Sequence, residues 1–486
     1  MRLSELFREV EFDGSIKNDA DINLVTDDSR LVRPGSLFVC IRHRSFDGHT
    51  AAVDALASGA AAVVTQDRLG LENELRVADS RSAYARLCAA LCNHPERKLR
   101  MIGVTGTNGK TTVTTLVRNI LSDSGTKTLL TGTVCNRLGD ENLPSGLTTP
   151  KPPELYSLLS RAVPQGCKAC VMEASSQALA QGRLEGIDFD AAVFTNITRD
   201  HLDYHGTFEN YISAKKKLFE HSDLSIVNLD DPRANEIIAA SKGKIITFST
   251  VLDCADYTAK NISLLSDCVR FELVSKGHIE HIEFASPGLF SVSNAMAAAV
   301  CAINFGIEPK DAAQSLAKSK SVCGRLERVE CSAPYSVIID YAHTPDGLEQ
   351  VLRALRPSCR GNLIVLFGCG GDRDRTKRPL MGAAACKYAD KIIVTSDNPR
   401  SEDPTKIIGD ILKGTDKKRR DLFVEPDRRK AIAFALKTAE PGDTVLLAGK
   451  GHEKYQLIGG EKLPLDERET VRKILGLPHD TGRKKQ

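Results

Sequence analysis

Apolar runs of strand length, each followed at once by polar or glycine-rich residues, recur in the last third of the chain. After about Glu327 the runs are SVIID, LIVLFG, KIIVTS and TVLLAG, and such runs predict strands buried on both faces of a parallel sheet. The segments that follow them are DYAHTPD, GCGGDRDRTKRP, DNPRSEDP and GKGHEKY. Because ligands bind outside the carboxyl ends of the strands in such a sheet, we expect these loops to converge on one site.

The same pattern extends toward the N-terminus. In the middle of the chain the strand MIGV runs into a glycine-rich loop, and ACVME and AAVFTN follow with helical segments between them, which predicts another mostly parallel sheet. The N-terminal part mixes strands such as GSLFVCI with the helical stretch AAVDALASGA and ends in the polar stretch NHPERK. We therefore predict an α/β protein with three domains, at residues 1–96, 97–328 and 329–486.

Composition narrows the range of partners. The 66 basic residues nearly balance the 63 acidic ones, so the formal charge of +3 gives no signal for nucleic acid or a membrane surface. The 14 cysteines are scattered, and Cys167 and Cys170 lack a second pair at zinc-site spacing, which favours reduced, buried thiols. No stretch reaches the roughly 18 apolar residues of a membrane span, and the N-terminus lacks a secretory signal. We expect a cytoplasmic protein, and a monomer because nothing suggests an obligate interface.

The segment VTGTNGKTT, residues 104–112, lies between the strand MIGV and an amphipathic helical stretch, as a phosphate-binding loop does. Its glycines let backbone N–H groups approach phosphate oxygens, Lys110 reaches the terminal phosphates, and Thr111 can hold Mg²⁺. Val104 stands where the usual motif has its first glycine, so a plain glycine-rich turn is the alternative. The predicted ATP-binding residues of this loop are Gly106, Thr107, Asn108, Gly109, Lys110, Thr111 and Thr112.

Two further residues follow predicted strands closely enough to complete a Mg²⁺ site. Glu173 ends the strand CVME, and His201 follows AAVFTN in the segment TRDHLDYHG. Magnesium takes hard oxygen ligands, and the ends of neighbouring strands lie close together in a parallel sheet. Taken alone, either residue could instead lie on the surface, since a lone histidine more often satisfies a local hydrogen bond than binds a metal.

Several motifs taken together resemble the Mur ligases of bacterial peptidoglycan synthesis. They are TGTNGKTT, TNITRDHLDYHG, DYAHTPDGLE, FGCGGDRDRTKRPLMG, DNPR and AGKGHEKYQ, and the likeness begins at TDDSRLVRPGSLFV near the start of the chain. Within the family the set is similar to the members that add the third amino acid, meso-diaminopimelate, to UDP-N-acetylmuramoyl-L-alanyl-D-glutamate. The resemblance implies an N-terminal UDP-binding domain, a central P-loop ATPase domain and a C-terminal Rossmann-like domain that binds the amino acid.

The resemblance also implies an ATP-dependent amide ligation. The D-glutamate carboxylate attacks the γ-phosphate of ATP to give an acyl phosphate, and the incoming amine then displaces phosphate. Lys110 and Mg²⁺ offset the charge that builds on the transferring phosphoryl group. Three consecutive lysines in YISAKKKLF are typical of a solvated helix face, but the resemblance implies that Lys215 is carried as a carbamate. The implied catalytic residues are Lys110, Glu173, His201 and Lys215, and the implied metal site is Thr111, Glu173, His201 and Lys215.

The remaining site residues are carried over from the resemblance. The nucleotide contacts beyond the P-loop are Asn294, Arg325, Asp340 and His343. The contacts to the UDP-substrate are Ser29, Thr148, Thr149, Ser175, Gln181 and Arg183, with a uridine contact in residues 44–46. The contacts to meso-diaminopimelate are Arg373, Asp397, Asn398, Arg400, Gly449 and Glu453.

The DNPR segment bears on the choice of amino acid. Arg400 follows Pro399, whose ring fixes φ, and its planar guanidinium matches a carboxylate with two hydrogen bonds. The distal end of meso-diaminopimelate carries a carboxylate and an ammonium, whereas L-lysine carries only an ammonium, so Arg400 is expected to bind the first group and Glu453 the second. A site built for a charged group rejects the analogue lacking it by about 10⁴-fold. The alternative is a helix-capping turn with Arg400 in solvent.

Other functions stay open from the sequence alone. The same ligase could use L-lysine. A folylpolyglutamate-synthase-like ligase shares the P-loop and the acyl-phosphate chemistry, although it should lack DNPR and the N-terminal TDDSR domain. A regulatory protein that binds ATP without forming a bond would not need the set of Glu173, His201 and Lys215, and a kinase would not need the converging loops of the third domain.

Overall fold

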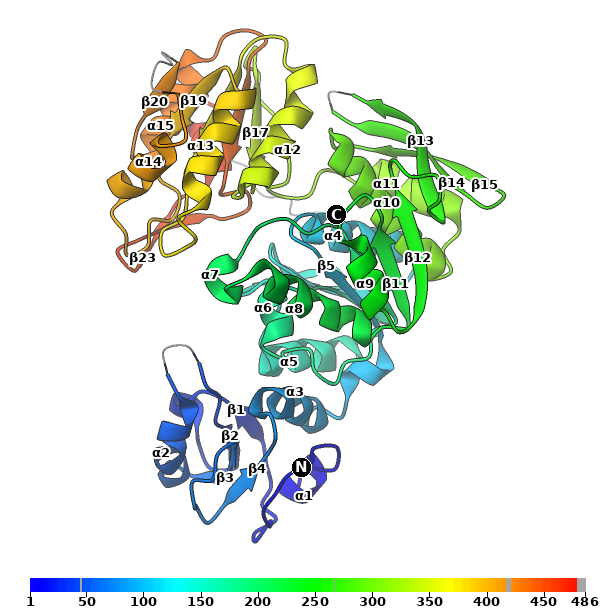
Figure 1. Cartoon of the computed structure of the whole chain (residues 1–486), viewed down its shortest axis with the longest axis vertical. Helices are drawn as coiled ribbons and strands as arrows, with labels where there is room; N and C mark the ends of the chain where they lie inside the picture. The colour runs from blue at the N-terminus through cyan, green and yellow to red at the C-terminus, as the bar shows by residue number, and fades with distance from the viewer. Residues whose placement is uncertain (44–45, 266, 417–420, 479–486) are drawn as a thin grey trace.

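The computed structural model describes residues 1–43, 46–265, 267–416 and 421–478. Three large sheets, each with its own helices, follow one another along the molecule, and the N-terminal sheet lies at one end (Figure 1). Within these described ranges, every helix is too short or too polar to cross a bilayer. The α/β class predicted from the sequence is confirmed.

The N-terminal domain is built on a small parallel sheet with strand order β1-β2-β3-β4. Both faces of this sheet are covered, because Leu37 and Val39 lie in one apolar core and Phe38 lies in another. The elements are α1 (Leu3–Leu6), β1 (Leu24–Thr26), η1 (Ser29–Leu31), β2 (Ser36–Val39), η2 (Gly48–Ala51), α2 (Ala52–Ala57), β3 (Ala60–Thr65), β4 (Glu74–Arg76), α3 (Ser80–Leu91) and η3 (Pro95–Lys98).

The central domain contains a long mixed sheet with strand order β15-β14-β13-β12-β11-β10-β5-β9-β6-β7-β8. Its middle strands are parallel, and antiparallel strands extend it at both edges. The elements are β5 (Arg100–Thr105), α4 (Lys110–Asp123), β6 (Thr128–Thr131), β7 (Asn136–Leu138), β8 (Glu141–Leu143), α5 (Pro152–Ala162), β9 (Ala169–Glu173), α6 (Ser176–Ala180), β10 (Ala191–Phe194), α7 (Leu202–His205), α8 (Phe208–Glu220), β11 (Leu224–Asn228), α9 (Ala234–Ala240), β12 (Lys244–Ser249), β13 (Tyr257–Leu264), β14 (Val269–Ser275), β15 (His278–Phe284), α10 (Leu289–Asn304) and α11 (Pro309–Lys318).

The third domain has strand order β16-β17-β21-β18-β19-β20, parallel except for β16. Strand β16 precedes the predicted boundary at residue 329 yet already pairs with β17, and the boundaries themselves stay predictions. The elements are β16 (Glu327–Arg328), β17 (Ser336–Asp340), α12 (Pro345–Leu355), η4 (Arg356–Ser358), β18 (Leu363–Phe367), α13 (Lys377–Tyr388), β19 (Lys391–Val394), α14 (Pro404–Leu412), β20 (Leu422–Val424), α15 (Arg428–Thr438), β21 (Thr444–Ala448), the hairpin β22 (Tyr455–Ile458) and β23 (Glu461–Pro464), and α16 (Glu467–Ile474).

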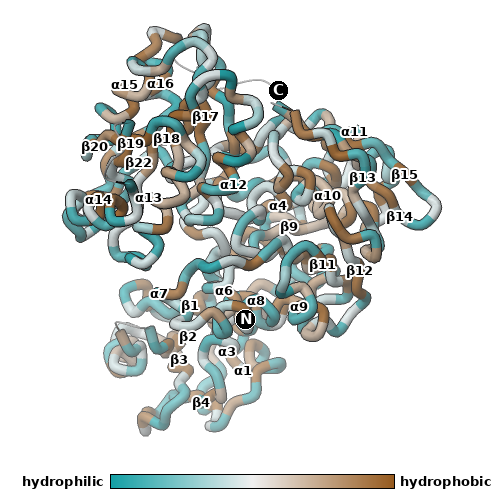
Figure 2. Tube along the Cα trace, turned by 45° about the horizontal axis from the view of Figure 1, so that its top comes forward, coloured by the Kyte–Doolittle hydropathy of each residue, from teal (hydrophilic) through white to brown (hydrophobic). Residues whose placement is uncertain are grey.

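The apolar patterns of the sequence account for how these elements pack. Helix α4 buries Val113, Leu116, Val117, Ile120 and Leu121 on one face, against the central sheet. The strands β17, β18, β19 and β21 are buried along most of their length between two apolar cores, as expected for a parallel sheet covered on both faces. In Figure 2, the trace is coloured as hydrophobic along the strands β17 and β18. The loops at the strand ends are therefore carried by a sheet that is packed on both faces.

Truncation of the central core gives a test of this packing. Leu116→Ala is expected to lower the free energy of unfolding by about 3 kcal/mol, because the cavity left behind adds to the lost transfer of apolar surface. Urea unfolding followed by circular dichroism measures the change. Leu264→Ala removes the same atoms from a side chain that is 49% exposed, and its transition should stay close to that of the unaltered chain. Equal shifts for the two variants would contradict the packing of α4.

Candidate functional site

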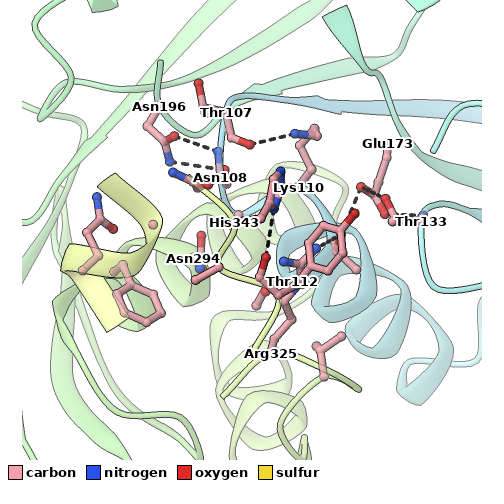
Figure 3. Close-up of a pocket in the computed structure, with 18 of the residues that line it drawn as sticks. Thr107, Asn108, Lys110, Thr112, Thr133, Glu173, Asn196, Asn294, Arg325 and His343 are labelled. Atoms are coloured by element: carbon pink, nitrogen blue, oxygen red, sulfur yellow. Dashed lines mark hydrogen bonds between the residues drawn. The ribbon is translucent and has the colours of Figure 1, made fainter. Parts of the chain in front are cut away.

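A cavity of about 210 Å³ opens at the carboxyl ends of the central strands, between the central and third domains. The P-loop forms one wall, and residues 340–351 of the third domain form another. Figure 3 shows P-loop side chains, Glu173, Arg325 and His343 directed around this space. Of the predicted nucleotide and metal residues, those that line it are Thr107, Asn108, Gly109, Lys110, Thr111, Thr112, Glu173, His201, Lys215, Asn294, Arg325, Asp340 and His343.

Hydrogen bonds to Asn196, just after the neighbouring strand β10, hold the P-loop in place. The Asn108 N–H donates to Asn196 Oδ1 (3.0 Å), and the Thr107 N–H donates to Asn196 O (2.8 Å). Gly109 has φ +87°, and a Cβ there would lie 2.5 Å from Asn294 Oδ1, so only glycine fits this position. The loop is thus fixed before the helix α4 begins, with the N-terminus of that helix facing the cavity.

Lys110 lines this cavity, and its ammonium donates hydrogen bonds to neutral carbonyl groups. Its Nζ donates to Gly106 O (2.8 Å) and Thr107 O (2.9 Å), both in the loop itself. Burial lowers the pKa of Lys110 because water is excluded from the ammonium. An anion in the cavity would offer this lysine a partner of opposite charge, which the loop carbonyls do not.

Glu173 is held at the end of β9 by hydrogen bonds to both of its oxygens. The Thr111 hydroxyl donates to Oε2 (3.0 Å), and Thr133 donates to Oε1 through its N–H (2.7 Å) and to Oε2 through its hydroxyl (2.9 Å). The side chain is almost fully buried, at 1% exposure. The P-loop hydroxyl and the carboxylate predicted to bind the same metal are therefore neighbours.

Lys215 is buried, which the run of three lysines did not suggest. Its Nζ donates to Gly106 O (2.8 Å) and lies 4.7 Å from the centre of the Tyr211 ring. Burial, with a smaller contribution from Lys110, lowers the pKa of Lys215 well below its usual value. An uncharged amine is the form that reacts with carbon dioxide. The prediction of a solvated face is wrong for Lys215, although Lys216 does pair with Glu236 at the surface.

Two of the side chains that line the cavity, Thr111 and Glu173, offer the oxygen ligands that Mg²⁺ prefers. Among the described residues, no three His, Cys, Asp or Glu side chains gather into a metal-binding group. The cavity instead offers the Glu173 carboxylate, the Thr111 hydroxyl and the His201 imidazole, whose pKa burial lowers to about 4 so that it stays neutral. A carbamate on Lys215 would add the oxygens that a hard cation prefers. Glu173, Thr111, His201 and modified Lys215 would hold the ion.

The linker to the third domain and that domain itself contribute the other side of the nucleotide cavity. Arg325 donates to the Thr111 hydroxyl (3.1 Å) and lies 4.6 Å from the centre of the Tyr341 ring. Asp340 accepts backbone hydrogen bonds on both oxygens, from Leu326 and Ala342 (2.7 Å each), so it positions the loop that carries His343. Burial lowers the pKa of His343 and raises that of Asp340.

A second cavity of about 170 Å³ adjoins the first. Loops after β17, β18, β19 and β21 all line it, so the predicted convergence of the four loops is confirmed. Asp200, His201, Tyr341 and His343 line both cavities, and they mark where a group on one ligand can meet the other. The residues expected to bind meso-diaminopimelate all line the second cavity, namely Arg373, Asp397, Asn398, Arg400, Gly449 and Glu453.

Arg400 is held by its backbone as well as by its side chain. Its φ is +54°, a left-handed conformation that costs a residue other than glycine about 1 kcal/mol. Its N–H donates to Leu457 O (2.9 Å) and its carbonyl accepts from Gly459 (2.7 Å), which ties it to the hairpin β22–β23. The guanidinium donates to Gly371 O (2.7 Å), and burial lowers the pKa of Arg400. These contacts argue against a turn with Arg400 free in solvent.

Two buried cations under the second cavity were missed by the sequence analysis. Lys450 has no exposed surface and donates to Asn398 Oδ1 (2.8 Å) and Glu453 Oε2 (2.6 Å). It stands between two glycines inside the motif AGKGHEKYQ, which was a usable signal. Arg428 donates to Ala448 O (2.8 Å) and pairs with Glu467 (2.8 Å), and both of these charged side chains are fully buried. Nothing local in the sequence pointed to Arg428.

Most of the residues predicted to contact the UDP-substrate form one network. Arg183 donates to Gln181 Oε1 (2.9 and 2.6 Å) and to Thr149 O (2.8 Å), and the Thr149 hydroxyl donates to Ser175 Oγ (3.1 Å). The Thr148 hydroxyl lies within hydrogen-bond distance of the Thr133 hydroxyl (3.1 Å).

Ser29 lies apart from this network, in the first domain. An ion pair between Lys151 and Asp27 (3.3 Å) links the two domains there. Within the predicted uridine segment, residues 44 and 45 lie outside the described part of the chain.

Family models match three successive parts of the chain. They are described as "Mur ligase family, catalytic domain" at residues 21–90, "Mur ligase middle domain" at residues 104–302 and "Mur ligase, glutamate ligase domain" at residues 324–451. These stretches coincide with the first sheet, most of the central domain and the larger part of the third domain.

Individual proteins resemble the chain over almost its whole length. The UDP-N-acetylmuramoyl-L-alanyl-D-glutamate--2,6-diaminopimelate ligase of Caldanaerobacter subterraneus subsp. tengcongensis is 43% identical over 479 residues, which cover 98% of this chain and 99% of that protein. The ligase of the same name from Syntrophomonas wolfei is 42% identical over 487 residues, with the same two shares.

Solved structures also resemble the chain over most of its length. A structure of a UDP-N-acetylmuramoyl-L-alanyl-D-glutamate--2,6-diaminopimelate ligase gives a TM-score of 0.70 at 35% identity and covers 98% of this chain and 99% of that one. Folylpolyglutamate synthase of Mycobacterium tuberculosis gives a TM-score of 0.64 at 17% identity, covering 82% and 95%, and so shares the fold alone. With full-length relatives above 40% identity and family models along all three domains, the chain belongs to the Mur ligase family.

Proposed function

We propose that this chain is an ATP-dependent ligase that joins meso-diaminopimelate to the D-glutamate of UDP-N-acetylmuramoyl-L-alanyl-D-glutamate, in the synthesis of peptidoglycan precursors. The observation that carries the proposal is the pair of adjoining cavities, one built around a P-loop and the other around Arg400 and Glu453. The named activity of the full-length relatives supports it.

The nucleotide cavity suits phosphoryl transfer to a carboxylate. We assign the phosphates of ATP to the P-loop, with Lys110 turning from the loop carbonyls to the terminal phosphates. Bound Mg²⁺ would offset negative charge on the transferring phosphoryl group. Thr149, Ser175 and Arg183 would direct the peptide end of the UDP-substrate toward the same place, since their network borders the cavity through Ser175.

The second step needs the amine of the amino acid beside the acyl phosphate. Arg400 and Glu453 would hold the distal carboxylate and ammonium, leaving the other end directed to the shared wall at His201 and His343. Enclosure between the domains would keep water from the acyl phosphate, which hydrolyses readily. Mg²⁺ and the carbamate on Lys215 are part of the proposal. The monomeric state and the cytoplasmic location stay predictions.

Phosphate release tests the function directly. The purified chain should release phosphate from ATP with Mg²⁺, the UDP-muramoyl-dipeptide and meso-diaminopimelate, and should release little with L-lysine or without an amino acid. Release with L-lysine instead would keep the ligase and overturn the assignment of Arg400. Absence of release with every amino acid would contradict ligation.

The assignment of Arg400 has its own test. Arg400→Ala is expected to raise KM for meso-diaminopimelate about 100-fold, because the substrate carboxylate would lose a half-buried charged partner. Steady-state phosphate release at saturating ATP measures KM. Arg375→Ala is the matched control, since that side chain is 70% exposed in a nearby loop and should leave KM unchanged. An unaltered KM in Arg400→Ala would remove the arginine from the substrate site.

Carbamylation of Lys215 can be tested without turnover. Because burial favours the neutral amine of Lys215, ¹³C-bicarbonate is expected to give a carbamate carbon resonance in the unaltered chain at neutral pH. The resonance should vanish in Lys215→Ala and persist in Lys216→Ala, which changes the next lysine of the same helix. Ligase activity should fall by about 100-fold or more in Lys215→Ala only. A spectrum without the resonance in the unaltered chain would exclude the carbamate.

A further inference from the structure

The loop after β18 and the loop after β19 are bonded to each other at the wall of the amino-acid cavity. The Arg400 guanidinium donates to Gly371 O (2.7 Å), and the Gly371 N–H donates to Asn398 O (2.9 Å). A Cβ on Gly371 would overlap Pro399 O, so the loops pass each other at a spacing that only glycine allows. The orientation of the Arg400 guanidinium therefore depends on where the opposite loop places the Gly371 carbonyl.

Asp372, the next residue, makes three further hydrogen bonds between the two loops. Its Oδ1 accepts from the Ser401 hydroxyl (2.7 Å) and its Oδ2 accepts from the Ser401 N–H (3.2 Å). The Asp372 N–H donates to Glu402 Oε1 (2.6 Å). These bonds join the residue after Gly371 to the two residues that follow Arg400.

The two partners of Asp372 differ in burial. Glu402 accepts from Arg378 on both oxygens (2.8 and 3.1 Å), and the Arg378 side chain is 1% exposed. Removing the partner of a buried cation is strongly destabilising, so Glu402 is needed for the fold of the domain. Asp372 and Ser401 are both exposed, and substitutions at such positions seldom unfold a domain. The bonds between Asp372 and Ser401 can therefore be removed while the domain stays folded.

Both loops have a left-handed residue at this contact. The φ angles are +53° for Asp372 and +54° for Arg400. Such a conformation is unfavourable for residues other than glycine, although asparagine and aspartate tolerate it better than most, and it persists only where surrounding contacts hold it. Because Ser401 directly follows Arg400, its bonds to Asp372 stabilise the conformation in which Arg400 lines the cavity.

We propose that Asp372 is a positioning residue for Arg400, because its hydrogen bonds to Ser401 hold the guanidinium where the distal carboxylate of the amino acid is bound. Asp372 does not line the cavity, so it acts on the substrate only through Arg400. The inference rests on the proposed function and deepens it. It adds a residue of the neighbouring loop to the recognition of the group that distinguishes meso-diaminopimelate from L-lysine.

Removal of the Asp372 carboxylate tests this role. Asp372→Gly adopts the left-handed conformation without strain and loses both bonds to Ser401, so KM for meso-diaminopimelate is expected to rise about tenfold with KM for ATP unchanged. Asp372→Asn keeps an acceptor for the Ser401 N–H and a donor for its hydroxyl, and it should retain the KM of the unaltered chain.

Asp403→Gly is the matched control. Asp403 accepts the same two kinds of hydrogen bond, from the Thr405 N–H (2.8 Å) and hydroxyl (2.7 Å), but both partners belong to one loop and Asp403 lies outside the cavity. Glycine is also tolerated at the start of a helix, where Asp403 stands. KM for meso-diaminopimelate should therefore stay unchanged in this variant.

A double variant separates positioning from a general loosening of the domain. In a chain that already carries Arg400→Ala, Asp372→Gly should raise KM by less than about twofold, since the group that Asp372 positions has been removed. The role of Asp372 would be overturned, with the ligase intact, by a tenfold rise in both backgrounds, by an unaltered KM in Asp372→Gly alone, or by an equal rise in Asp372→Asn.

Hydrogen–deuterium exchange of the ligand-free chain gives a second readout that needs no turnover. Residues 398–402 should exchange faster in Asp372→Gly than in the unaltered chain, and equal exchange would contradict the proposed contact between the loops. If Asp372→Gly is unfolded by circular dichroism, Ser401→Ala removes the hydroxyl bond alone and is read in the same way. If the unaltered chain releases no phosphate with meso-diaminopimelate, the proposed function is wrong, and exchange still judges the contact separately.

Discussion

Parallel strand pairing is the constraint on which both cavities depend. Because β5, β9 and β10 run in one direction, the P-loop, Glu173 and Asn196 come out at the same edge of the central sheet. The third sheet applies the same rule to β17, β18, β19 and β21. Residues far apart in the sequence, such as Lys110 and His343, therefore line one cavity because the strands that precede them end at the same edge of their sheets.

Several charged side chains are buried at the carboxyl ends of the strands, and they are stabilised by different kinds of partner. Glu173 is balanced by threonine hydroxyls and an N–H, Asp340 by two backbone N–H groups, and Arg428 by Glu467. Lys110 and Lys215, by contrast, reach mainly neutral oxygens. Both lysines line the cavity where phosphate is proposed to bind, so they place positive charge where an anion would lie.

The sequence analysis predicted those features that depend on residues close together in the chain. Strand runs, the amphipathic α4 and the loops at strand ends follow from neighbouring residues, and so the P-loop and the converging loops were found. Burial of Lys215 depends on how α8 packs against the P-loop, and the pairing of Arg428 depends on α16, so neither has a local signature. The antiparallel strands β13–β15 were likewise missed, because their alternation is interrupted by exposed apolar residues such as Leu264 and Ile279.

The pair of Arg428 and Glu467 has a consequence for the order in which the protein is completed. Arg428 holds the ends of β19 and β21 through Ser396 O and Ala448 O, but its counter-charge lies on α16, near the end of the chain. While the ribosome is still making the chain, the nucleotide loop and its strands are available long before Glu467 emerges. The P-loop wall of the first cavity can thus fold while Arg428 still lacks its counter-charge, and the walls that the third domain adds to both cavities are completed only after the last part of the chain has been synthesised.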